Sequence, residues 1–587
     1  MIKKLVRQML AAQILSAMTV SLCLLIDNLM IGRFLGDGAL TAYGLANPLL
    51  LVNGAVGSML CAGAQVACGR SLGRGDKAET DIGYSSAVVV AFGFSLVFTL
   101  LVVLFRTPLA RLLGADKPAL LQDTSAYMAG FIIGAPASMG ALILVPFLQM
   151  AGQGNLLIVA VLAMTVSDVA FDILNVTVFH GGMFGMGLAS SLSYYVAVAI
   201  AAGYFLSKRC VFDFSFSRVK RRKIRELVAD GVPTVFGMAS SVVLILAVNH
   251  ILMASGGDAA VAAFSVINTI INTSNCISTG TGGVALTLSG VLYNEEDRTG
   301  LSELWRLLER RAVVLGAAVM ALLVVLARPC AALFIPYAGE SQELAVMGLR
   351  IFSLGLIPCC LSNALRNCYQ GTGRMWMMET ICVLANALLP TLAAFLLNRA
   401  LGVTATWFYF VVAECLTLAT VLGYVWLKKG RVTLDARDIL LLRNDLGVHK
   451  KDRMEASLHN LQEVMDFSRA ADYFCRAHSG SNRLASHLAL CIEEMGTNIV
   501  THGFRGSERN SLSIRLQVKD GRWTLRFRDD CVAFDPLSHI SGAEAGESVG
   551  ILLAMRISDE ARYTYSMNLN NLMLVLRDSA AGDETGG

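Results

Sequence analysis

The chain has 587 residues, of which 55% are hydrophobic and only 16% are charged. About a quarter of the residues of an ordinary soluble protein are charged, so this composition excludes a wholly soluble chain, and the small net charge of +4 gives no indication of nucleic-acid binding. Long apolar runs extend to about residue 427, and charges become frequent from about residue 428. The sequence therefore predicts a large membrane part followed by a smaller soluble domain.

A helix needs about 20 apolar residues to cross a membrane. The segments that satisfy this requirement are 9–33, 42–68, 82–105, 124–148, 156–179, 184–206, 230–254, 260–292, 312–335, 345–368, 376–398 and 403–427. The expected fold is a polytopic all-α membrane protein with twelve transmembrane helices in two six-helix bundles, plus a C-terminal cytosolic α/β sandwich.

Basic residues are concentrated on one side of the predicted membrane part. The loops of this side contain Lys3, Lys4, Arg7, Arg70, Arg74, Lys77, the dense run 207–225, Arg306, Arg310, Arg311, Lys428, Lys429 and Arg431. Loops rich in Lys and Arg remain in the cytoplasm. We therefore expect a multi-pass protein of a bacterial cytoplasmic (inner) membrane, surrounded by membrane lipid, with both termini in the cytosol.

The membrane part contains an internal repeat. "GDGALTAYGLAN" begins at Gly36 and "GDAAVAAFSVIN" begins at Gly257, 221 residues later (257 − 36). A second match, "AGQGN" from Ala151 and "QGTGR" from Gln370, is 219 residues apart (370 − 151). Duplicated halves are typical of secondary transporters. No Walker-type phosphate loop occurs in the sequence of this part, so it is not expected to be a self-contained ATP pump.

Two segments of the first half carry a family resemblance. "IDNLMIGRFLGDGALTAYGLANPL" and the following "GAQVACGRSLGRGD" resemble the multidrug and toxic compound extrusion (MATE) transporters, over roughly residues 1–430. The resemblance implies bundles at 1–206 and 230–430, joined by a basic linker at 207–229, with a V-shaped cavity. It also implies export of small cationic or lipophilic compounds, with H⁺ or Na⁺ as the coupling ion.

Three acids lie within predicted spans of the first half, where a carboxylate is costly and normally functional. Asp168 and Asp172 are four residues apart, so they share one helix face, and Asp27 lies at a similar depth to Asp172. Carboxylates close together take up a proton or a cation. The resemblance implies a cation-coupling role for Asp27 and Asp172, and Asp168 stands at a position that resembles an amide in the family.

The second half has no counterpart to this group, because the position equivalent to Asp27 is Val248. Glu414, near the middle of the last span, either faces the substrate cavity and attracts cations or is a protonated packing acid. Asn47 is a second candidate for the substrate cavity. It precedes Pro48, which is expected to kink the second span.

The soluble part contains a polar helix with a repeated spacing. In "CIEEMGTNIVTHGF", Glu494, Asn498 and His502 recur every four residues on one side of a predicted helix over 484–502. Two alternating segments follow, "SLSIRLQV" and "GRWTLRFRDD", and both are predicted strands. Asp529 continues the inward face of the second strand. An acid at such a place is a good ligand group.

Three motifs of the soluble part carry a second family resemblance: Glu494-x-x-x-Asn498, "DDCVAFDP" and "GESVGILL". Together they resemble the GHKL ATP-binding fold, and in particular its anti-sigma-factor serine-kinase branch. The resemblance places a domain at 452–578, after a linker at 431–451 and before a disordered tail at 579–587. It implies that Asn498 holds Mg²⁺, Glu494 is the general base, Asp529 binds the adenine amino group and Gly550 lies in the loop over the phosphates of ATP. Cys531 and Ser548 replace expected glycines, so a degenerate domain retained for protein contacts stays an alternative.

These features support three hypotheses about function. The first is a gradient-driven exporter with a cytosolic regulatory domain that resembles a nucleotide-binding domain and contacts a cytosolic regulatory protein. The second is a membrane sensor that signals through a serine-kinase-like domain. The third is a flippase for lipid-linked precursors.

Overall fold

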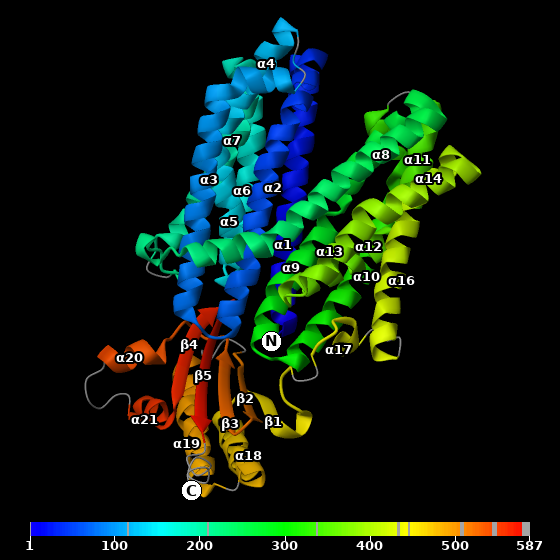
Figure 1. Ribbon diagram of the computed structural model, residues 1–587. Coiled ribbons are helices and arrows are strands. Elements are labelled where there is room, and N and C mark those ends of the chain that lie inside the picture. Colours follow the sequence, from blue (N-terminus) through cyan, green and yellow to red (C-terminus); the bar gives the residue numbers. More distant parts are fainter. Residues whose placement is uncertain are drawn as a thin grey trace.

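The computed structural model of the chain describes residues 2–113, 115, 117–207, 210–335, 339–430, 435–443, 446–479, 481–504, 510–542 and 549–577. It has two helical lobes and a sheet domain below them (Figure 1). The predicted tail at 579–587 and the predicted phosphate-loop residue Ser548 lie outside the described residues.

The N-terminal lobe, the N-lobe, is a helical bundle. Its helices are α1 (Ile2–Met30), α2 (Asp37–Gly73), α3 (Lys77–Leu112), α4 (Pro118–Ile132), α5 (Ala135–Met150), α6 (Gly154–Leu174) and α7 (Gly182–Phe205). Helices α4 and α5 are bent by 47° relative to each other. Pro136 stands in the first turn of α5, where its missing N–H costs no hydrogen bond and where it cannot continue the preceding helix.

The C-terminal lobe, the C-lobe, repeats this arrangement. Its helices are α8 (Arg221–Ser274), α9 (Cys276–Asn294), α10 (Arg298–Phe334), α11 (Glu340–Ser353), α12 (Leu356–Gly371), α13 (Met375–Val383), α14 (Leu389–Leu401), α15 (Val403–Thr406) and α16 (Tyr409–Lys429). Helices α11 and α12 are bent by 50°. The last part of the predicted linker 207–229 is helical, because α8 already begins at Arg221.

Ten helices of the described residues are long and apolar enough to cross a membrane, or twelve if each bent pair counts as one span. The predicted fold class is therefore confirmed. The two bent pairs are the predicted spans 124–148 and 345–368, which the sequence pattern presented as continuous. Hydropathy does not distinguish a straight span from a broken one, because a bend changes no side chain.

The backbone conformation of four glycines supports the internal repeat. Gly36 has φ +88° and Gly257 has φ +57°, a region that residues with a Cβ rarely adopt. Gly152 and Gly373 form a second pair, with φ +77° and +76°. This pair is also 221 residues apart (373 − 152), so the structure aligns the second match at 221 rather than 219 residues.

The C-terminal domain, the sheet domain, has a five-stranded antiparallel sheet in the order β1-β2-β3-β5-β4. Its elements are β1 (Arg453–Leu458), α18 (Leu461–Ser479), α19 (Asn482–Asn498), β2 (Leu512–Lys519), β3 (Arg522–Asp529), α20 (Pro536–Gly542), α21 (Val549–Ile557), β4 (Glu560–Ser566) and β5 (Leu569–Arg577). Helices α18 and α19 cover one face of the sheet, where Trp523, Leu525 and Phe527 are buried as the alternation predicts.

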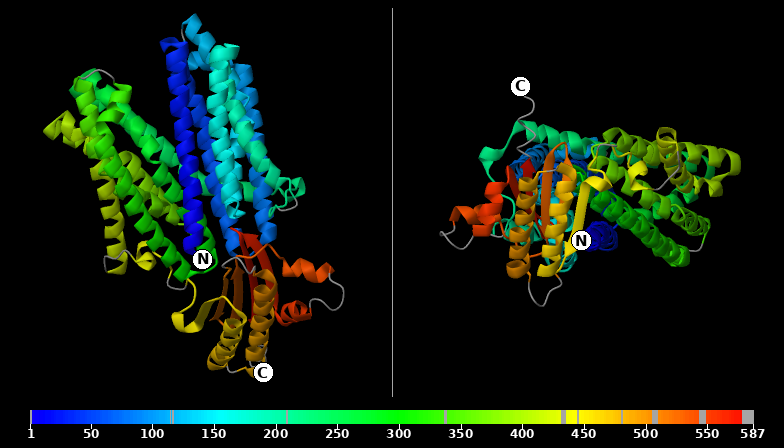
Figure 2. Two further views of the ribbon diagram at one scale, coloured as in Figure 1. Left: turned by 180° about the vertical axis from the view of Figure 1, so that it is seen from behind. Right: turned by 90° about the horizontal axis from the view of Figure 1, so that it is seen from below.

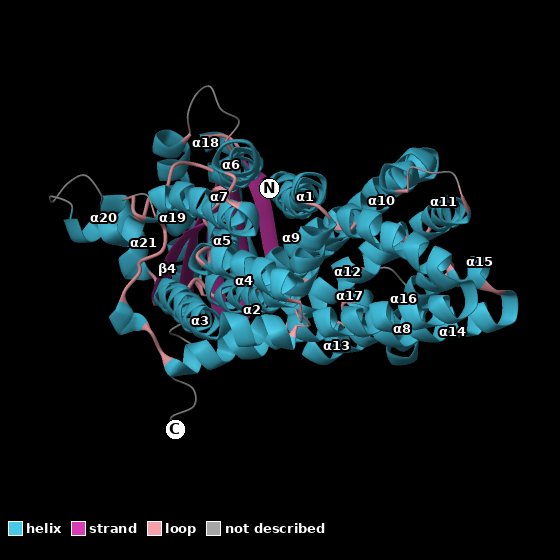
Figure 3. Cartoon of the chain, turned by 90° about the horizontal axis from the view of Figure 1, so that it is seen from above, coloured by secondary structure: helices cyan, strands magenta, loops and turns pink. Residues whose placement is uncertain are grey.

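The sheet domain lies at the end of the molecule where the two lobes approach each other (Figures 1 and 2). At that end α1 and α2 of the N-lobe contact α8 and α9 of the C-lobe. The lobes diverge toward the opposite end, and the view from above shows them side by side (Figure 3). The start of α1 lies on the same side as the sheet domain (Figure 1).

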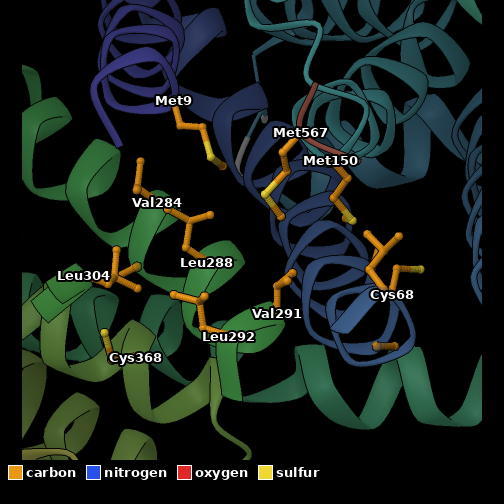
Figure 4. Packing of buried hydrophobic residues seen from close by; sticks show 14 of the residues in the cluster. Met9, Cys68, Met150, Val284, Leu288, Val291, Leu292, Leu304, Cys368 and Met567 are labelled. Carbon is orange, nitrogen blue, oxygen red and sulfur yellow. The ribbon is translucent and has the colours of Figure 1, made fainter. Parts of the chain in front are cut away.

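One hydrophobic cluster joins both lobes and the sheet domain. It includes Met9 of α1, Leu288 of α9 and Met567 of the turn between β4 and β5 (Figure 4). The short helix α17 (Ala436–Ile439) of the predicted linker joins the same cluster. The buried Tyr369 hydroxyl donates a hydrogen bond to the carbonyl of Ile439. The sheet domain is therefore packed against the membrane part and is not a freely tethered module.

Candidate functional sites

The N-lobe brings its three acids together. Asp27 comes from α1, and Asp168 and Asp172 come from one face of α6, which packs against α1. Their side chains are buried, with exposed fractions of 5%, 2% and 0%. Asp27 interacts electrostatically with both of the others. Three buried carboxyl groups therefore share one site, as their positions in the sequence suggested.

Few hydrogen bonds compensate these acids within the described residues. The Ser190 hydroxyl on α7 donates to Asp27 Oδ2 at 3.4 Å. Asp27 Oδ1 and both carboxyl oxygens of Asp168 and of Asp172 have no partner in standard hydrogen-bond geometry among those residues, although Cys23 and Ser193 lie near Asp168 and Asp27 lies near Asp172. Buried polar groups are normally satisfied. Carboxyl oxygens that lack hydrogen-bond donors are suitable ligands for a proton or a hard cation. Ser190 was not predicted, because a lone serine in an apolar helix gives no signal in the sequence.

The equivalent place in the C-lobe is apolar. Val248 is fully buried in a cluster with Leu252, Ala393 and Trp407. Glu414 of α16 is buried elsewhere in this lobe, and the Ser362 hydroxyl donates to its Oε2 at 2.5 Å. The substrate-cavity role and the packing role of Glu414 both stay predictions.

Asn47 lies on the surface of α2, directly before Pro48. It is exposed, and α2 continues as one helix through the proline from Asp37 to Gly73. Asn47 therefore makes no part of the acid cluster. Its predicted role at a substrate surface stays a prediction.

In the sheet domain, Glu494, Asn498 and Gly550 lie at one end of α19. Asn498 is the last residue of α19, and Glu494 stands one turn before it. Gly550 belongs to the first turn of α21, and its backbone lies so close to the Glu494 carboxyl group that a Cβ would overlap it. A side chain at this position would displace the Glu494 carboxyl group, so the glycine leaves that group its present place.

Asp529 ends β3 and is 4% exposed. Its Oδ1 accepts hydrogen bonds from Asn570 Nδ2 at 2.7 Å and from the Cys531 backbone N–H at 3.0 Å. Burial raises the pKa of this carboxyl group, and these donors oppose the rise. Cys531 packs toward Gly503, where a Cβ would lie 3.0 Å from the Cys531 sulfur. The absence of a side chain at Gly503 makes room for the cysteine.

These residues fit a nucleotide with its metal ion. A single amide oxygen, that of Asn498, suits Mg²⁺, which keeps waters and phosphate oxygens as its other ligands. No cluster of three or more metal-ligating side chains occurs in the part of the chain that the structure describes. Any Mg²⁺ would therefore depend on the phosphates of ATP for its remaining ligands.

A second set of charged residues joins the sheet domain to the C-lobe. The loop between α9 and α10 contains Glu295, Glu296 and Asp297, here called the acidic loop, and it faces the open side of the sheet. Glu295 pairs with Arg526 at 3.1 Å and with Arg528 at 2.6 Å. Glu296 pairs with Lys519 at 2.9 Å. Asp297 pairs with Arg453 at 3.4 Å and also with Arg515. The sequence analysis missed this surface, although Arg526 and Arg528 alternate with the apolar residues of β3.

Burial alone would raise the pKa of the Asp297 carboxyl group, but the guanidiniums of Arg515 and Arg453 hold it well below its usual range. The same carboxylate caps α10 by accepting from the Gly300 N–H at 2.9 Å. Asp297 is therefore a charged group that connects a C-lobe helix to two strands.

The N-lobe holds the other edge of the sheet. The Met567 N–H donates to the Met150 carbonyl at 2.5 Å, and Asn568 Nδ2 donates to the Gly152 carbonyl at 2.8 Å. Arg562 of β4 donates to the Arg74 carbonyl at 3.0 Å. Figure 4 shows Met567 beside Met150 and near α9. The sheet domain thus contacts both lobes where they meet.

The comparison with protein families agrees with this two-fold organisation. The sequence pattern of the MatE family matches residues 12–174 and again residues 233–396, together more than half of the chain. The chain belongs to the MatE family. The two matches begin 221 residues apart (233 − 12), which is the spacing of the repeat. The pattern of the histidine kinase-like ATPase domain matches residues 454–576, so both predicted resemblances are confirmed.

Known proteins of the MatE family align with the membrane part. The multidrug export protein MepA of Staphylococcus saprophyticus is 23% identical over 423 residues, covering 70% of this chain and 91% of that protein. A mutant of the Vibrio cholerae MATE transporter VcmN has a TM-score of 0.68 at 16% identity, covering 75% and 99% of the two chains. A MOP superfamily transporter from Pyrococcus furiosus has a TM-score of 0.65 at 19% identity, covering 72% and 95%. At these identities the solved structures support the fold.

Proposed function

We propose that this protein exports small cationic or lipophilic compounds from a bacterial cell in exchange for protons or sodium ions. The observation that carries the proposal is the group of three buried carboxyls in the N-lobe, Asp27, Asp168 and Asp172, whose oxygens largely lack partners. An acid inside a membrane protein is costly unless it is used. The relative MepA is named a multidrug export protein, and this points to the same substrate class.

The orientation of the protein follows from its charges. The start of α1 and the sheet domain lie on one side (Figure 1), which is also the side of Arg70, Arg74 and Lys77. By the preference of basic loops for the cytoplasm, this side is cytosolic. The lobes then diverge toward the outside, so the structure corresponds to an outward-facing state of the transporter.

Transport in vesicles tests this proposal. The full-length protein is reconstituted into liposomes with a fluorescent cationic dye, and an imposed pH gradient is compared with an imposed Na⁺ gradient of equal size. One of the two gradients is expected to drive dye movement, and collapsing that gradient with an ionophore is expected to stop it. Dye movement that is independent of both gradients would reject ion coupling.

We further propose that the sheet domain binds ATP weakly and regulates export. Asn498 would bind Mg²⁺ together with the ATP phosphates, and Glu494 would stand beside it as the basic carboxylate. Asp529 would accept from the adenine amino group through Oδ2, since both hydrogen bonds described above go to Oδ1. Cys531 and the replacement of glycine by Ser548 argue for weak binding, because a loop with fewer glycines presents fewer free N–H groups to phosphate.

Regulation would act through the docking of the sheet. Its β4–β5 turn contacts Met150 and Gly152 of the N-lobe, while β1, β2 and β3 hold the acidic loop of the C-lobe. Separation of the lobes at this end requires at least one of these contacts to break. The docked sheet therefore favours the outward-facing state, and a nucleotide that loosens it would speed the return to the inward-facing state.

The docking proposal has a matched pair of variants. Arg528→Gln removes a contact to the acidic loop, whereas Arg522→Gln, on the same strand, removes only a pair with Glu560 inside the domain. Hydrogen–deuterium exchange of the α9–α10 loop is expected to rise for Arg528→Gln alone. Equal exchange in both variants would mean that the pair does not hold the domain in place.

A further inference from the structure

A basic pocket lies on the outer side of the N-lobe. It has a volume of about 460 Å³ and is lined by residues from the end of α2, the start of α3 and the start of α8. Its charged lining residues are Arg70, Arg74, Arg222, Lys223 and Arg225 with Glu79 and Glu226. Five cations therefore face two carboxylates. Asp230, which pairs with Arg70 from beside the pocket, lowers the excess of positive charge from three to two.

The two carboxylates are each shared between cations. Glu79 lies 3.2 Å from Lys223 and 3.3 Å from Arg222, and Glu226 lies 3.3 Å from Lys223 and 3.5 Å from Arg70. The Lys223 side chain is only 3% exposed, so its ammonium group is held at the bottom of the pocket.

Two guanidinium groups of the pocket have no counter-ion in the described part of the chain. Arg74 and Arg225 are exposed and form no ion pair with any residue that the structure describes. Guanidinium groups bind phosphate oxygens through paired N–H donors. The excess charge of the pocket matches a ligand of one or two negative charges.

The surroundings of the pocket indicate the membrane interface. The segment that leads into α8 exposes Leu206 by 87%, Phe214 by 43% and Phe216 by 76%, and the two phenylalanine rings contact each other at 5.0 Å. Aromatic and basic residues together are typical of the headgroup level of a membrane protein. The start of α8 also runs crosswise to the N-lobe helices, as a helix in the plane of the interface does (Figure 1).

We infer that this pocket binds the phosphate group of an anionic phospholipid from the cytoplasmic leaflet. Basic pockets between helices on this side of a membrane suit such headgroups. The ligand would contact α2, α3 and the start of α8 at once. Because α8 belongs to the C-lobe, a bound lipid stabilises the contact between the two lobes. The close approach of Gly231 on α8 to the Met59 carbonyl on α2 keeps this contact in place.

Lipid binding to the full-length protein tests the inference. The purified protein is mixed with phosphatidylglycerol and phosphatidylcholine in detergent, and bound lipids are counted by native mass spectrometry. The double variant Arg74→Gln/Arg225→Gln is compared with Arg106→Gln/Arg111→Gln, which changes two exposed arginines of α3 outside the pocket. Each arginine near anionic headgroups contributes about 1 kcal/mol, and 1.4 kcal/mol is tenfold, so the first variant is expected to lose about thirtyfold in preference for phosphatidylglycerol.

Two further arms make the test independent of misfolding. Glu79→Gln removes a carboxylate that competes with the ligand, so it is expected to raise the preference for phosphatidylglycerol. Free inorganic phosphate is expected not to displace the lipid at equal concentration. Wild-type protein without a preference for phosphatidylglycerol, equal loss in both double variants, or displacement by inorganic phosphate would each overturn the assignment to a lipid headgroup.

Discussion

The two lobes share one backbone plan but not one chemistry. Asp27, Asp168 and Asp172 of the N-lobe correspond, at the repeat spacing of 221 residues, to Val248, Leu389 and Ala393 of the C-lobe. The first set is a cluster of buried acids, whereas Val248 and Ala393 lie in an apolar cluster. The two lobes share positive-φ glycines at equivalent turns, whereas the cluster of buried acids lies in the N-lobe. This difference supports the proposal that the N-lobe carries the coupling ion.

The loops that face the sheet domain also differ between the lobes, and here it is the C-lobe that carries the specialised charged residues. Asp76 and Asp297 occupy equivalent positions, and each caps the following helix at 2.9 Å. Gly75 of the N-lobe corresponds to Glu296 of the C-lobe, which keeps the positive φ at +54°. Such a conformation is costly for a residue with a Cβ, and the pair of Glu296 with Lys519 offsets part of the cost. The C-lobe loop is therefore specialised for holding the sheet domain.

Neutralising the N-lobe acids is the strongest test of the proposed difference between the lobes. Asp27→Asn and Asp172→Asn are each expected to reduce gradient-driven dye export to the level of empty vesicles, since neither amide can exchange a proton. Export is measured at equal amounts of inserted protein. Asp123→Asn, on α4 of the same lobe, is the control and is expected to export normally. Wild-type export by both cluster variants would rule out the coupling role.

The reverse exchange places an acid in the C-lobe. Val248→Asp is expected to destabilise the protein by about 4 kcal/mol, because the carboxylate would be buried without a partner. Val248→Ala, which removes only methyl groups, is expected to cost about 1–2 kcal/mol. The midpoint of thermal unfolding in detergent measures both. If Val248→Asp were as stable as the alanine variant, the C-lobe site would tolerate charge and the comparison would fail.

The two helix-capping aspartates give a third contrast. Asp297→Asn is expected to weaken sheet docking by about 3 kcal/mol, since it removes the charge that pairs with Arg515 and Arg453. Asp76→Asn is expected to cost less than about 1 kcal/mol, because asparagine also caps helices. Limited proteolysis of the connection before β1 reports docking. Similar cleavage in both variants would contradict the role of the ion pairs.

The pH dependence of docking follows from the same carboxylate. The pKa of Asp297 is lower in the docked protein than its ordinary value. Its stabilising effect is therefore fully present above the ordinary aspartate pKa, about 4, and is lost as the pH falls below that value. Asp297→Asn is expected to remove this part of the acid sensitivity. Unchanged acid sensitivity in the variant would assign it to other groups.

A smaller effect is expected in the nucleotide site. Asp529→Asn is expected to abolish the weak heat of ATP binding to the full-length protein, and Asn498→Ala to remove its Mg²⁺ dependence. Calorimetry at millimolar nucleotide measures both. Wild-type protein that gives no binding heat would mean that the domain is a contact module without a nucleotide.

The smallest effect is expected at Glu414. Because Ser362 already bonds this buried acid, Glu414→Gln is expected to weaken the export of cationic dyes slightly more than that of neutral ones. The ratio of the two export rates is the readout. An unchanged ratio would leave Glu414 with a packing role only.

Much of this account could be predicted from the sequence, for identifiable reasons. Apolar runs located the spans, and the Gly36 and Gly257 motifs revealed the repeat. The four-residue spacing of Asp168 and Asp172 placed both on one face, and the alternation in β3 placed Asp529 inward. These are local patterns, and local geometry fixes them.

The remaining features depend on contacts between distant segments. The bends between α4 and α5 and between α11 and α12 leave hydropathy unchanged. Ser190 becomes a partner of Asp27 only after α1 and α7 meet. In the sequence, the acidic loop and the arginines of β2 and β3 look like ordinary surface charges. They pair only because the sheet domain docks on the C-lobe, and no local periodicity predicts that docking.

Ion exchange by the purified protein tests the central claim most directly. A cationic substrate is added to the protein in weakly buffered detergent solution, and released protons or sodium ions are measured by a pH electrode or a sodium electrode. We predict that the wild type releases ions on binding substrate, that Asp27→Asn and Asp172→Asn release none, and that Glu414→Gln releases as many as the wild type. Equal release by the wild type and the N-lobe variants would contradict the assignment of the coupling site to the N-lobe.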